Sequence, residues 1–305
     1  MVVGYNAGVQ KILIVGSGDV ARRILSRLAR RYRVYAVLRD SRRAVAWRSA
    51  GAKPVVADLD DRASLQRLSG LADLVLHLAP PPAEGPRDTR TRNLLAALGK
   101  SKSLPRRLVY VSTTGVYGDC AGASIDETRR LNPESSRAAR RVDAERCLRR
   151  WGKQTGVQVS ILRAPGIYAT DRLPVERLHK RLPALVAADD VFTNHIHADD
   201  LASACIAALR HGGANRAYNA VDDSALRMAE YFDRVADAFA LPRPPRISRD
   251  QAEKTLSPVQ MSFMRESRRI GNRRIKKELK LSLAYPTIDD GIAEALRSRR
   301  NACSS

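Results

Sequence analysis

The chain contains no long apolar run, because polar and charged residues interrupt every stretch before the roughly 18 residues that a membrane-spanning helix needs. Its first residues lead almost directly into an apolar strand, and no charged region followed by a long apolar segment marks a secretory signal. The cysteines form no CxxC pair and no metal-ligand spacing. We therefore expect a cytoplasmic protein with reduced thiols and no metal centre. The four cysteines are Cys120, Cys147, Cys205 and Cys303.

Acidic residues are scarce, with 32 Asp and Glu against 54 Lys and Arg, which gives a net charge of +22. Such an excess favours an anionic partner, which is a nucleotide, an anionic substrate or a nucleic acid. Aromatic residues make up only 5% of the chain, and basic pairs such as Arg149 and Arg150 are not interleaved with them, as a nucleic-acid stacking surface requires. An arginine-rich composition with solvated helix faces is the plain alternative. We expect nucleotide binding rather than nucleic-acid binding.

The stretch 11–23 (KILIVGSGDVARR) predicts a strand, a tight glycine turn and the start of a helix. In this geometry, backbone N–H groups and a helix N-terminus face an incoming pyrophosphate. Gly16 permits the turn, Gly18 lets phosphates approach the backbone, and Ala21 keeps helix and strand close. Glycine turns also serve purely structural ends, but this one opens the first βα unit of an alternating chain. The predicted cofactor contacts here are Gly16, Ser17, Gly18, Asp19 and Val20.

The rest of the chain alternates short apolar strands with helices, which predicts an α/β fold. We expect a Rossmann doubly wound parallel sheet with a smaller, discontinuous C-terminal substrate lobe. The strands are predicted at 34–38, 53–56, 74–78, 107–112, 158–162 and 216–219. The NAD(P)-binding domain is assigned to 1–165 and 195–223, the lobe to 166–194 and 224–296, and a loose tail to 297–305.

After the second strand the chain turns at Arg39 and Asp40, about 20 residues past the glycines, where a Rossmann unit meets the adenosine ribose. Arg39, with Arg42 and Arg43 on the next turn, suits the 2′-phosphate of NADP, because a guanidinium binds phosphate in a bidentate way. Two alternatives stay open. Asp40 could bind the ribose hydroxyls of NAD, and Arg39 could merely end a surface strand.

Two further loops are predicted at the same edge of the sheet. Asp58 and Leu59 follow the third strand, which places them beside the adenine in a doubly wound sheet. The fourth strand runs through Leu78 into Ala79 and three prolines, which continue neither a helix nor a strand. Because open α/β sheets bind ligands at their carboxyl edge, Leu78, Ala79 and Pro80 are predicted cofactor contacts.

More motifs follow in order along almost the whole chain. They are STTGVYGD at 112–119, DET at 126–128, RAPGIY at 163–168, HIHADDL at 195–201, YN at 218–219 and a closing segment at 277–291. This series resembles the extended and atypical short-chain dehydrogenase/reductases, the NAD(P)-dependent nucleotide-sugar epimerases and dehydratases. The resemblance is greatest to the atypical, YeeZ-like subgroup, and it implies that Pro165 also contacts the cofactor.

In that family the chemistry rests on a Ser or Thr and a YxxxK pair, whose tyrosine transfers protons because the lysine and the cofactor lower its pKa. The resemblance puts Thr113 at the Ser/Thr position, Arg137 at the tyrosine and Arg141 at the lysine. Arginine stays protonated, so Arg137 cannot transfer a proton, although Arg141 can donate to the nicotinamide ribose. Asp88 matches an acid of the atypical subgroup, and Tyr117 is a candidate replacement proton donor.

Tyr168 and His197 lie in segments that the family places around the same cleft, so they are further candidate donors. His195 and His197 with two acids on one turn do not make a convincing metal cage. Asp199 is instead predicted to cap the helix that follows.

Taken together, these features predict an NADP(H)-dependent oxidoreductase or epimerase whose active site lacks the YxxxK tyrosine and lysine. The alternative is a catalytically weak or inactive NADP(H)-binding sensor or regulatory protein. The expected partners are the dinucleotide cofactor and a small-molecule substrate, which the charge suggests is anionic. Relatives often dimerise through the helix that corresponds to 137–151, which is a reason to expect a homodimer.

Overall fold

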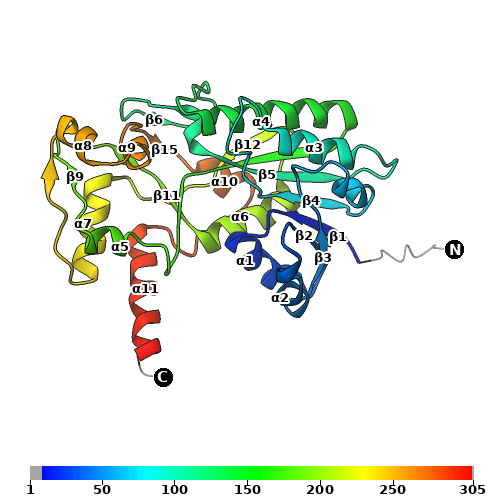
Figure 1. The fold of residues 1–305 in the computed structure, drawn as a ribbon, viewed down its shortest axis with the longest axis horizontal. Helices are drawn as coiled ribbons and strands as arrows, with labels where there is room; N and C mark the ends of the chain where they lie inside the picture. Colours follow the sequence, from blue (N-terminus) through cyan, green and yellow to red (C-terminus); the bar gives the residue numbers. More distant parts are fainter. Residues whose placement is uncertain (1–8, 304–305) are drawn as a thin grey trace.

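The computed structural model describes residues 9–303, apart from the side chains of Pro258, Val259, Phe263, Ala302 and Cys303. Its centre is a sheet of seven parallel strands (Figure 1). In chain order these are β1 (Lys11–Val15), β2 (Arg33–Leu38), β3 (Ala52–Val56), β4 (Leu74–His77), β5 (Arg107–Thr113), β7 (Gln158–Ala164) and β12 (Arg216–Asn219).

The strands lie in the order β12-β7-β5-β4-β1-β2-β3, and every neighbouring pair is parallel. Strand order reverses between β1 and β4, the point at which open α/β sheets bind ligands beyond the carboxyl ends of their strands. The strands are continuous apolar runs because both faces of the sheet are covered, so that Ile12, Leu13 and Ile14 are fully buried. The predicted Rossmann doubly wound fold is confirmed.

Helices cover both faces of this sheet (Figure 1). On one face, α1 (Asp19–Leu28), α2 (Ala44–Ser49) and α6 (Ala198–His211) pack through buried side chains such as Ile24, Trp47 and Leu201. On the other face, α3 (Thr89–Leu98) and α4 (Ser136–Thr155) pack through Leu95 and Leu148. The short 3-10 helices η1 (Ser41–Arg43), η2 (Ser64–Leu68) and η3 (Thr114–Tyr117) form connections.

A third core cluster forms in the C-terminal part of the chain around Phe232, Met261 and Ile292. All its buried residues fall within 166–194 or 224–296, the segments assigned to the lobe, whose exact limits stay a prediction. The remaining elements are β6 (Ser124–Ile125), β8 (Gly166–Tyr168), α5 (Val175–His179), β9 (Ala184–Leu185), β10 (Phe192–Thr193), β11 (His195–His197), β13 (Leu226–Arg227), α7 (Met228–Ala238), β14 (Arg246–Ile247), α8 (Arg249–Thr255), α9 (Pro258–Phe263), β15 (Arg269–Ile270), α10 (Arg273–Glu278) and α11 (Ile288–Cys303).

The end of the chain differs from the loose tail predicted for 297–305. Helix α11 continues to Cys303, and the guanidinium of Arg299 lies 4.9 Å from the centre of the Phe239 ring at the end of α7. Residues 304–305 lie outside the described residues.

The cysteines Cys120, Cys147 and Cys205 carry free thiols, and the side chain of Cys303 lies outside the described residues. Within residues 9–303, no helix combines the length and the apolar character needed to cross a membrane.

Candidate functional site

The glycine turn lies between β1 and α1, at the point where strand order reverses. Gly16 has a φ of +102°, and a Cβ there would stand 2.5 Å from the backbone nitrogen of Ala79. Only glycine fits this position, because the end of β1 packs directly on the loop after β4. Ala21 is 1% exposed in the core beneath α1, which agrees with the close packing of helix and strand predicted for it.

Gly18 is the N-cap residue of α1, and no side chain caps this end of the helix. A Cβ on Gly18 would meet no atom within 4 Å, so the backbone of the first turn is accessible. The first N–H groups of a helix have no partner within the helix, and they attract an anion. The arrangement is therefore suited to a phosphate group.

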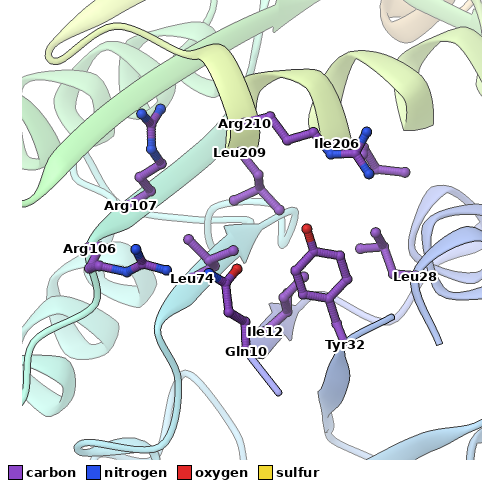
Figure 2. Close-up of a pocket in the computed structure, with 10 residues that line it drawn as sticks. All are labelled: Gln10, Ile12, Leu28, Tyr32, Leu74, Arg106, Arg107, Ile206, Leu209 and Arg210. Atoms are coloured by element: carbon purple, nitrogen blue, oxygen red, sulfur yellow. The ribbon is translucent and has the colours of Figure 1, made fainter. Parts of the chain in front are cut away.

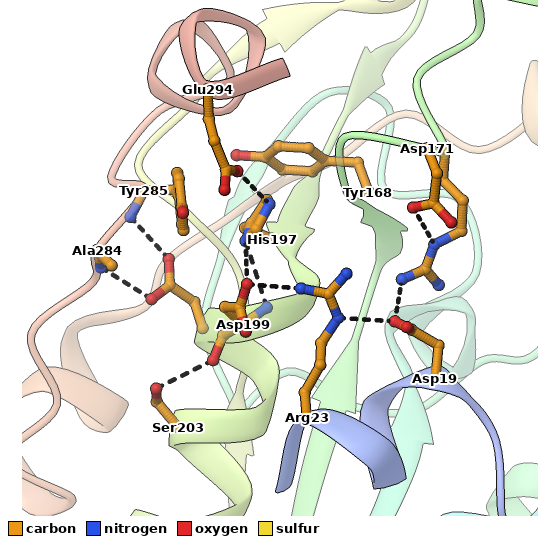
Figure 3. Close-up of polar contacts among 12 residues, drawn as sticks. Asp19, Arg23, Tyr168, Asp171, His197, Asp199, Ser203, Ala284, Tyr285 and Glu294 are labelled. Carbon is orange, nitrogen blue, oxygen red and sulfur yellow. Dashed lines mark hydrogen bonds and ion pairs between the residues drawn. The ribbon is translucent and has the colours of Figure 1, made fainter. Parts of the chain in front are cut away.

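Asp19 places a carboxylate in this first turn, next to the accessible amides. Arg23 donates from Nε to Asp19 Oδ2 at 2.8 Å (Figure 3). Arg172, from the segment between β8 and α5, pairs with the same oxygen. Partial burial acts to raise the pKa of Asp19, but the two arginines outweigh it and hold the pKa below its ordinary value. The negative charge of Asp19 is thus neutralised by Arg23 of α1 and by Arg172 of the segment assigned to the lobe.

The prediction that Asp199 caps α6 is wrong. Helix α6 begins at Ala198, and its N-cap is His197, whose Nδ1 accepts from the Asp199 amide at 3.3 Å. The Asp199 carboxylate instead accepts from Arg23 at 2.6 Å (Figure 3). It also accepts from Arg27 at 2.7 Å, and the two contacts tie α6 to α1.

The region after β2 is rich in positive charge. Arg39 is exposed and makes no hydrogen bond to another described residue, whereas Arg43 donates to the carbonyl oxygen of Ser17 at 2.6 Å. Arg42 Nε lies 3.0 Å from Asp40 Oδ1, and this hydrogen bond lowers the pKa of Asp40. The one carboxylate at this position is therefore already paired with a cation.

The two predicted loops at the carboxyl edge are joined by Arg90. Its guanidinium binds Asp60 at 2.6 Å and also approaches the carbonyl oxygen of Pro80 at 3.4 Å. In the loop after β3, the Asp58 amide donates to the Ser64 hydroxyl at 2.9 Å. The side chain of Leu59 in the same loop is buried in the core.

Thr113 lies at the carboxyl end of β5, and the side chain of Arg141 contacts the same strand. The Thr113 hydroxyl accepts from the Gly115 amide at 3.3 Å, which leaves its own hydrogen to donate. Arg141 extends from α4 and donates to the Val111 carbonyl oxygen at 2.8 Å and to the Tyr110 hydroxyl at 2.9 Å. The structure thus fixes a permanent positive charge against Tyr110 and Val111 of β5. Pro165 is half-buried between β7 and β8.

Asp88 is the N-cap of α3 and is 1% exposed. Its two oxygens accept from the amide and the hydroxyl of Thr91, at 3.0 and 2.7 Å, and Thr91 in turn contacts His77 at 2.9 Å. Burial, aided by the charge of Arg141, lowers the pKa of His77 to about 3, and burial raises the pKa of Asp88. Asp88 does not reach an open cleft, and its effect on a ligand would act through Arg141.

The structure argues against the predicted catalytic role of Tyr117. This residue is 1% exposed, and its hydroxyl donates to Asn219 at 2.7 Å and accepts from Arg163 at 2.9 Å. Burial raises the pKa of Tyr117, against the direction that proton transfer at neutral pH requires. Arg163 is also held by Glu145 at 2.7 Å, so Tyr117 is one member of a buried polar cluster.

Tyr168 and His197, the other candidate donors, are also buried. Tyr168 donates to the Thr287 carbonyl oxygen at 3.2 Å, and His197 stacks on Tyr285 with ring centres 3.7 Å apart (Figure 3). Burial lowers the pKa of His197, whose Nε2 lies 3.3 Å from Glu294 on α11. His197 thus joins α11 to the sheet domain, whereas Tyr168 lies in the core of the lobe and contacts the residue that precedes α11.

Arg137 is exposed in the first turn of α4, so the position that the resemblance gives to the tyrosine carries a cation. Arg172 and Arg90 were not predicted from the sequence, because their contacts span 153 and 30 residues and leave no local pattern. Among residues 9–303, no group of three or more His, Cys, Asp or Glu side chains is placed to hold a metal ion.

Fold and site together define a dinucleotide-binding protein of the Rossmann class. More particularly, residues 12–220 match the model of the NAD dependent epimerase/dehydratase family, and the chain belongs to that family. The match shows the family and does not confirm the predicted resemblance to its YeeZ-like subgroup.

Among curated proteins, GDP-6-deoxy-D-mannose reductase of Pseudomonas aeruginosa is 28% identical over 192 residues. The match covers 55% of this chain and 63% of that protein, so the chain spans less than two thirds of the relative. An uncharacterised protein of Schizosaccharomyces pombe is 36% identical over 85 residues, which cover 26% of this chain and 23% of that protein.

Solved structures share the fold over almost the whole chain. A functionally unknown conserved protein from Silicibacter pomeroyi superposes with a TM-score of 0.76 at 26% identity, covering 95% of this chain and 99% of that one. UDP-glucose 4-epimerase of Thermotoga maritima, solved with UDP-glucose, gives a TM-score of 0.78 at 18% identity, with coverage of 96% and 99%. A short-chain dehydrogenase/reductase superfamily protein of Agrobacterium tumefaciens, solved with bound NAD, gives 0.74 at 18% identity, with coverage of 96% and 98%.

Proposed function

We propose that the protein binds NADP(H) and acts as an oxidoreductase or epimerase that works without the YxxxK tyrosine and lysine. The observation that carries this proposal is the accessible, uncapped first turn of α1 behind Gly16 and Gly18, at the switch point of the sheet. Membership of an NAD-dependent family supports a nicotinamide dinucleotide as the ligand of this turn.

The proposed cofactor site follows the carboxyl edge of the sheet. The glycine turn binds the pyrophosphate, the loop after β3 borders the adenine, and the loop after β4 with Arg141 borders the nicotinamide half. The proposed contacts are Gly16, Ser17, Gly18, Asp19, Val20, Arg39, Asp58, Leu59, Leu78, Ala79, Pro80, Arg141 and Pro165.

NADP is preferred over NAD in this proposal because of the charges after β2. Arg39 is exposed and forms no hydrogen bond or ion pair with a described residue, and its charge acts on Asp60 only through space, while Asp40 is paired with Arg42 at 3.0 Å. A 2′-phosphate would gain a bidentate partner here, whereas the ribose hydroxyls of NAD would compete with Arg42 for Asp40.

The bound nicotinamide would supply or accept the hydride. Thr113 would donate its hydroxyl hydrogen to a substrate oxygen, and Arg141 would donate to the nicotinamide ribose. Arg137 could stabilise negative charge on a substrate oxygen, but it cannot deliver a proton because it stays protonated. Asp88 would act as a positioning residue through the charge of Arg141 rather than as a group that touches substrate.

An anionic substrate is part of the proposal. The relative that acts on a GDP-linked deoxysugar and the neighbour solved with UDP-glucose both handle anionic nucleotide sugars, as their names state. The net charge of +22 suits a substrate of that sign. A cytoplasmic location and a homodimer through α4 remain predictions.

The second candidate function is an NADP(H)-binding sensor with little chemistry of its own. Two observations favour it: Arg137 at the tyrosine position, and the burial of Tyr117 with its hydroxyl already bound at both sides.

Turnover separates the two candidates. NADPH oxidation is followed with carbonyl compounds and nucleotide sugars, using the wild type and the double variant Arg137→Tyr with Arg141→Lys. Oxidation by the wild type supports the enzyme. Tight NADPH binding without turnover across the panel contradicts the enzyme and supports the sensor. Activity that appears only in the double variant identifies the missing pair as the cause.

A further inference from the structure

The loop that connects β4 to α3 runs along the carboxyl edge of the sheet, beside the proposed cofactor site. Residues 83–87 of this loop are exposed, and four residues of the loop are prolines, which have no amide to donate. No backbone hydrogen bond joins one of residues 79–87 to another, although the structure describes all of them. Side chains from neighbouring elements must therefore fix the loop.

Both ends of the loop are held by such side chains. At the first end, the guanidinium of Arg90 approaches the carbonyl oxygen of Pro80 at 3.4 Å. At the other end, the Asp88 amide donates to the carboxylate of Asp143, on α4, at 2.9 Å. The exposed residues between these ends need a contact of their own.

Arg140 of α4 supplies a contact to the middle of the loop. Its Nη1 donates to the carbonyl oxygen of Gly85 at 2.8 Å. Because Arg140 is only 6% exposed, water hardly competes for this hydrogen bond. A hydrogen bond from a charged donor is stronger than a neutral one, and exclusion of water strengthens it further.

The charge of Arg140 distinguishes it from the other buried arginines in residues 9–303. Arg163 pairs with Glu145 at 2.7 Å, and Arg268 pairs with Glu266 at 2.6 Å. Arg140 forms no ion pair with a described residue, and its buried Nε has no hydrogen-bond partner among them. A buried charge without a counter-charge does not favour the folded state. The contribution of Arg140 is therefore its contact with the loop.

We propose that Arg140 is a positioning residue that holds residues 83–87 and, through them, the loop that borders the nicotinamide half of the cofactor. It binds the loop backbone and not the cofactor. Ala79 and Pro80, at the start of the same loop, are the proposed cofactor contacts that it keeps in place. This positioning role rests on the proposed function, whereas the contact between Arg140 and the loop does not.

The first measurement needs no cofactor. Glu84 is exposed in the loop, so cleavage after Glu84 by endoproteinase Glu-C, mapped by mass spectrometry, reports how often the loop opens. Arg140→Met removes the donor and keeps a long side chain, whereas Arg140→Lys keeps a charged donor. The control Arg106→Met removes an exposed guanidinium at the amino edge of the sheet, where Arg106 borders a cavity of about 330 Å³ (Figure 2).

We expect cleavage after Glu84 to be at least about tenfold faster in Arg140→Met, or about 1.4 kcal/mol, and to change less than about threefold in Arg140→Lys and in the control. The Tm of Arg140→Met should not fall by more than about 2 °C, because an apolar side chain replaces an unpaired buried charge. Equal cleavage rates in Arg140→Met and the wild type would overturn the loop contact and the proposal with it.

The second measurement compares binding of NADPH, by fluorescence, with binding of 2′,5′-ADP, which lacks the nicotinamide half, by calorimetry. Arg140→Met should weaken NADPH binding at least about fivefold and 2′,5′-ADP binding less than about twofold. Equal weakening of both ligands, or unchanged NADPH affinity despite faster cleavage, would overturn the positioning role. Absence of NADPH binding to the wild type would contradict the proposed function and the positioning role, while the cleavage rates would still decide whether Arg140 holds the loop.

Discussion

Replacement of Tyr117 by Phe tests whether this tyrosine is a core residue or a proton donor. The change removes one oxygen and no carbon from a side chain that is 1% exposed, so it opens little space. It leaves Asn219 Oδ1 without the donor at 2.7 Å and Arg163 without the acceptor at 2.9 Å. Both of these partners are buried, at 0% and 3% exposure.

A buried polar group that loses its partner costs about 1–3 kcal/mol. Arg163 keeps its pairing with Glu145 at 2.7 Å, which limits its share of the loss. We therefore expect the free energy of unfolding to fall by about 2–4 kcal/mol in total, which corresponds to a fall in Tm of about 3–6 °C for a chain of this size. Cofactor affinity should not change.

The assay combines thermal unfolding, followed by circular dichroism, with NADPH titration by fluorescence. Tyr35→Phe is the matched control, because the Tyr35 hydroxyl makes no hydrogen bond to a described residue, and its Tm should stay within about 1 °C of the wild type. An unchanged Tm in Tyr117→Phe together with loss of NADPH oxidation would refute the structural role and would support a catalytic role for Tyr117.

Three other predictions concern the site and its surroundings. Gly16→Ala should weaken NADPH binding at least about tenfold in a fluorescence titration, because the new Cβ would stand 2.5 Å from a backbone nitrogen at a φ of +102°; unchanged affinity would contradict this. Arg172→Ala should weaken NADPH binding severalfold by exposing the pyrophosphate to the charge of Asp19, and adding Asp19→Asn should restore it; failure of the second change to restore affinity would exclude charge as the cause. Burial raises the pKa of Asp222 to about 8 from 3.8, so this group is more protonated in the folded state, and its contribution to stability is lost as pH rises from about 4 through about 8. Asp222→Asn should remove that loss in unfolding measured across this pH range, and an unaltered pH slope would contradict the assignment.

Much of the fold could be predicted because its signals are local. The glycine turn is recognisable because Gly16, which has φ > 0, directly follows an apolar strand. The helix predicted at 89–98 and the strand predicted at 216–219 have the bounds of α3 and β12. A buried parallel strand must be apolar on both faces, so short apolar runs between helices identify the sheet.

The side chains of the site were harder to predict because their partners are distant in sequence. Tyr117 lies at the end of a 3-10 turn, and its burial depends on Arg163 and Asn219, which are 46 and 102 residues away. Arg172 reaches Asp19 across 153 residues. No spacing rule relates such positions, since tertiary packing alone sets the direction of each side chain.

The most direct test of the account is a calorimetric comparison of NADPH and NADH binding to the wild type and to Arg39→Ser. The account predicts that NADPH binds the wild type at least about tenfold more tightly than NADH, a difference of about 1.4 kcal/mol, and that Arg39→Ser abolishes this preference while NADH affinity is kept. Tighter binding of NADH, or no binding of either dinucleotide, would contradict it.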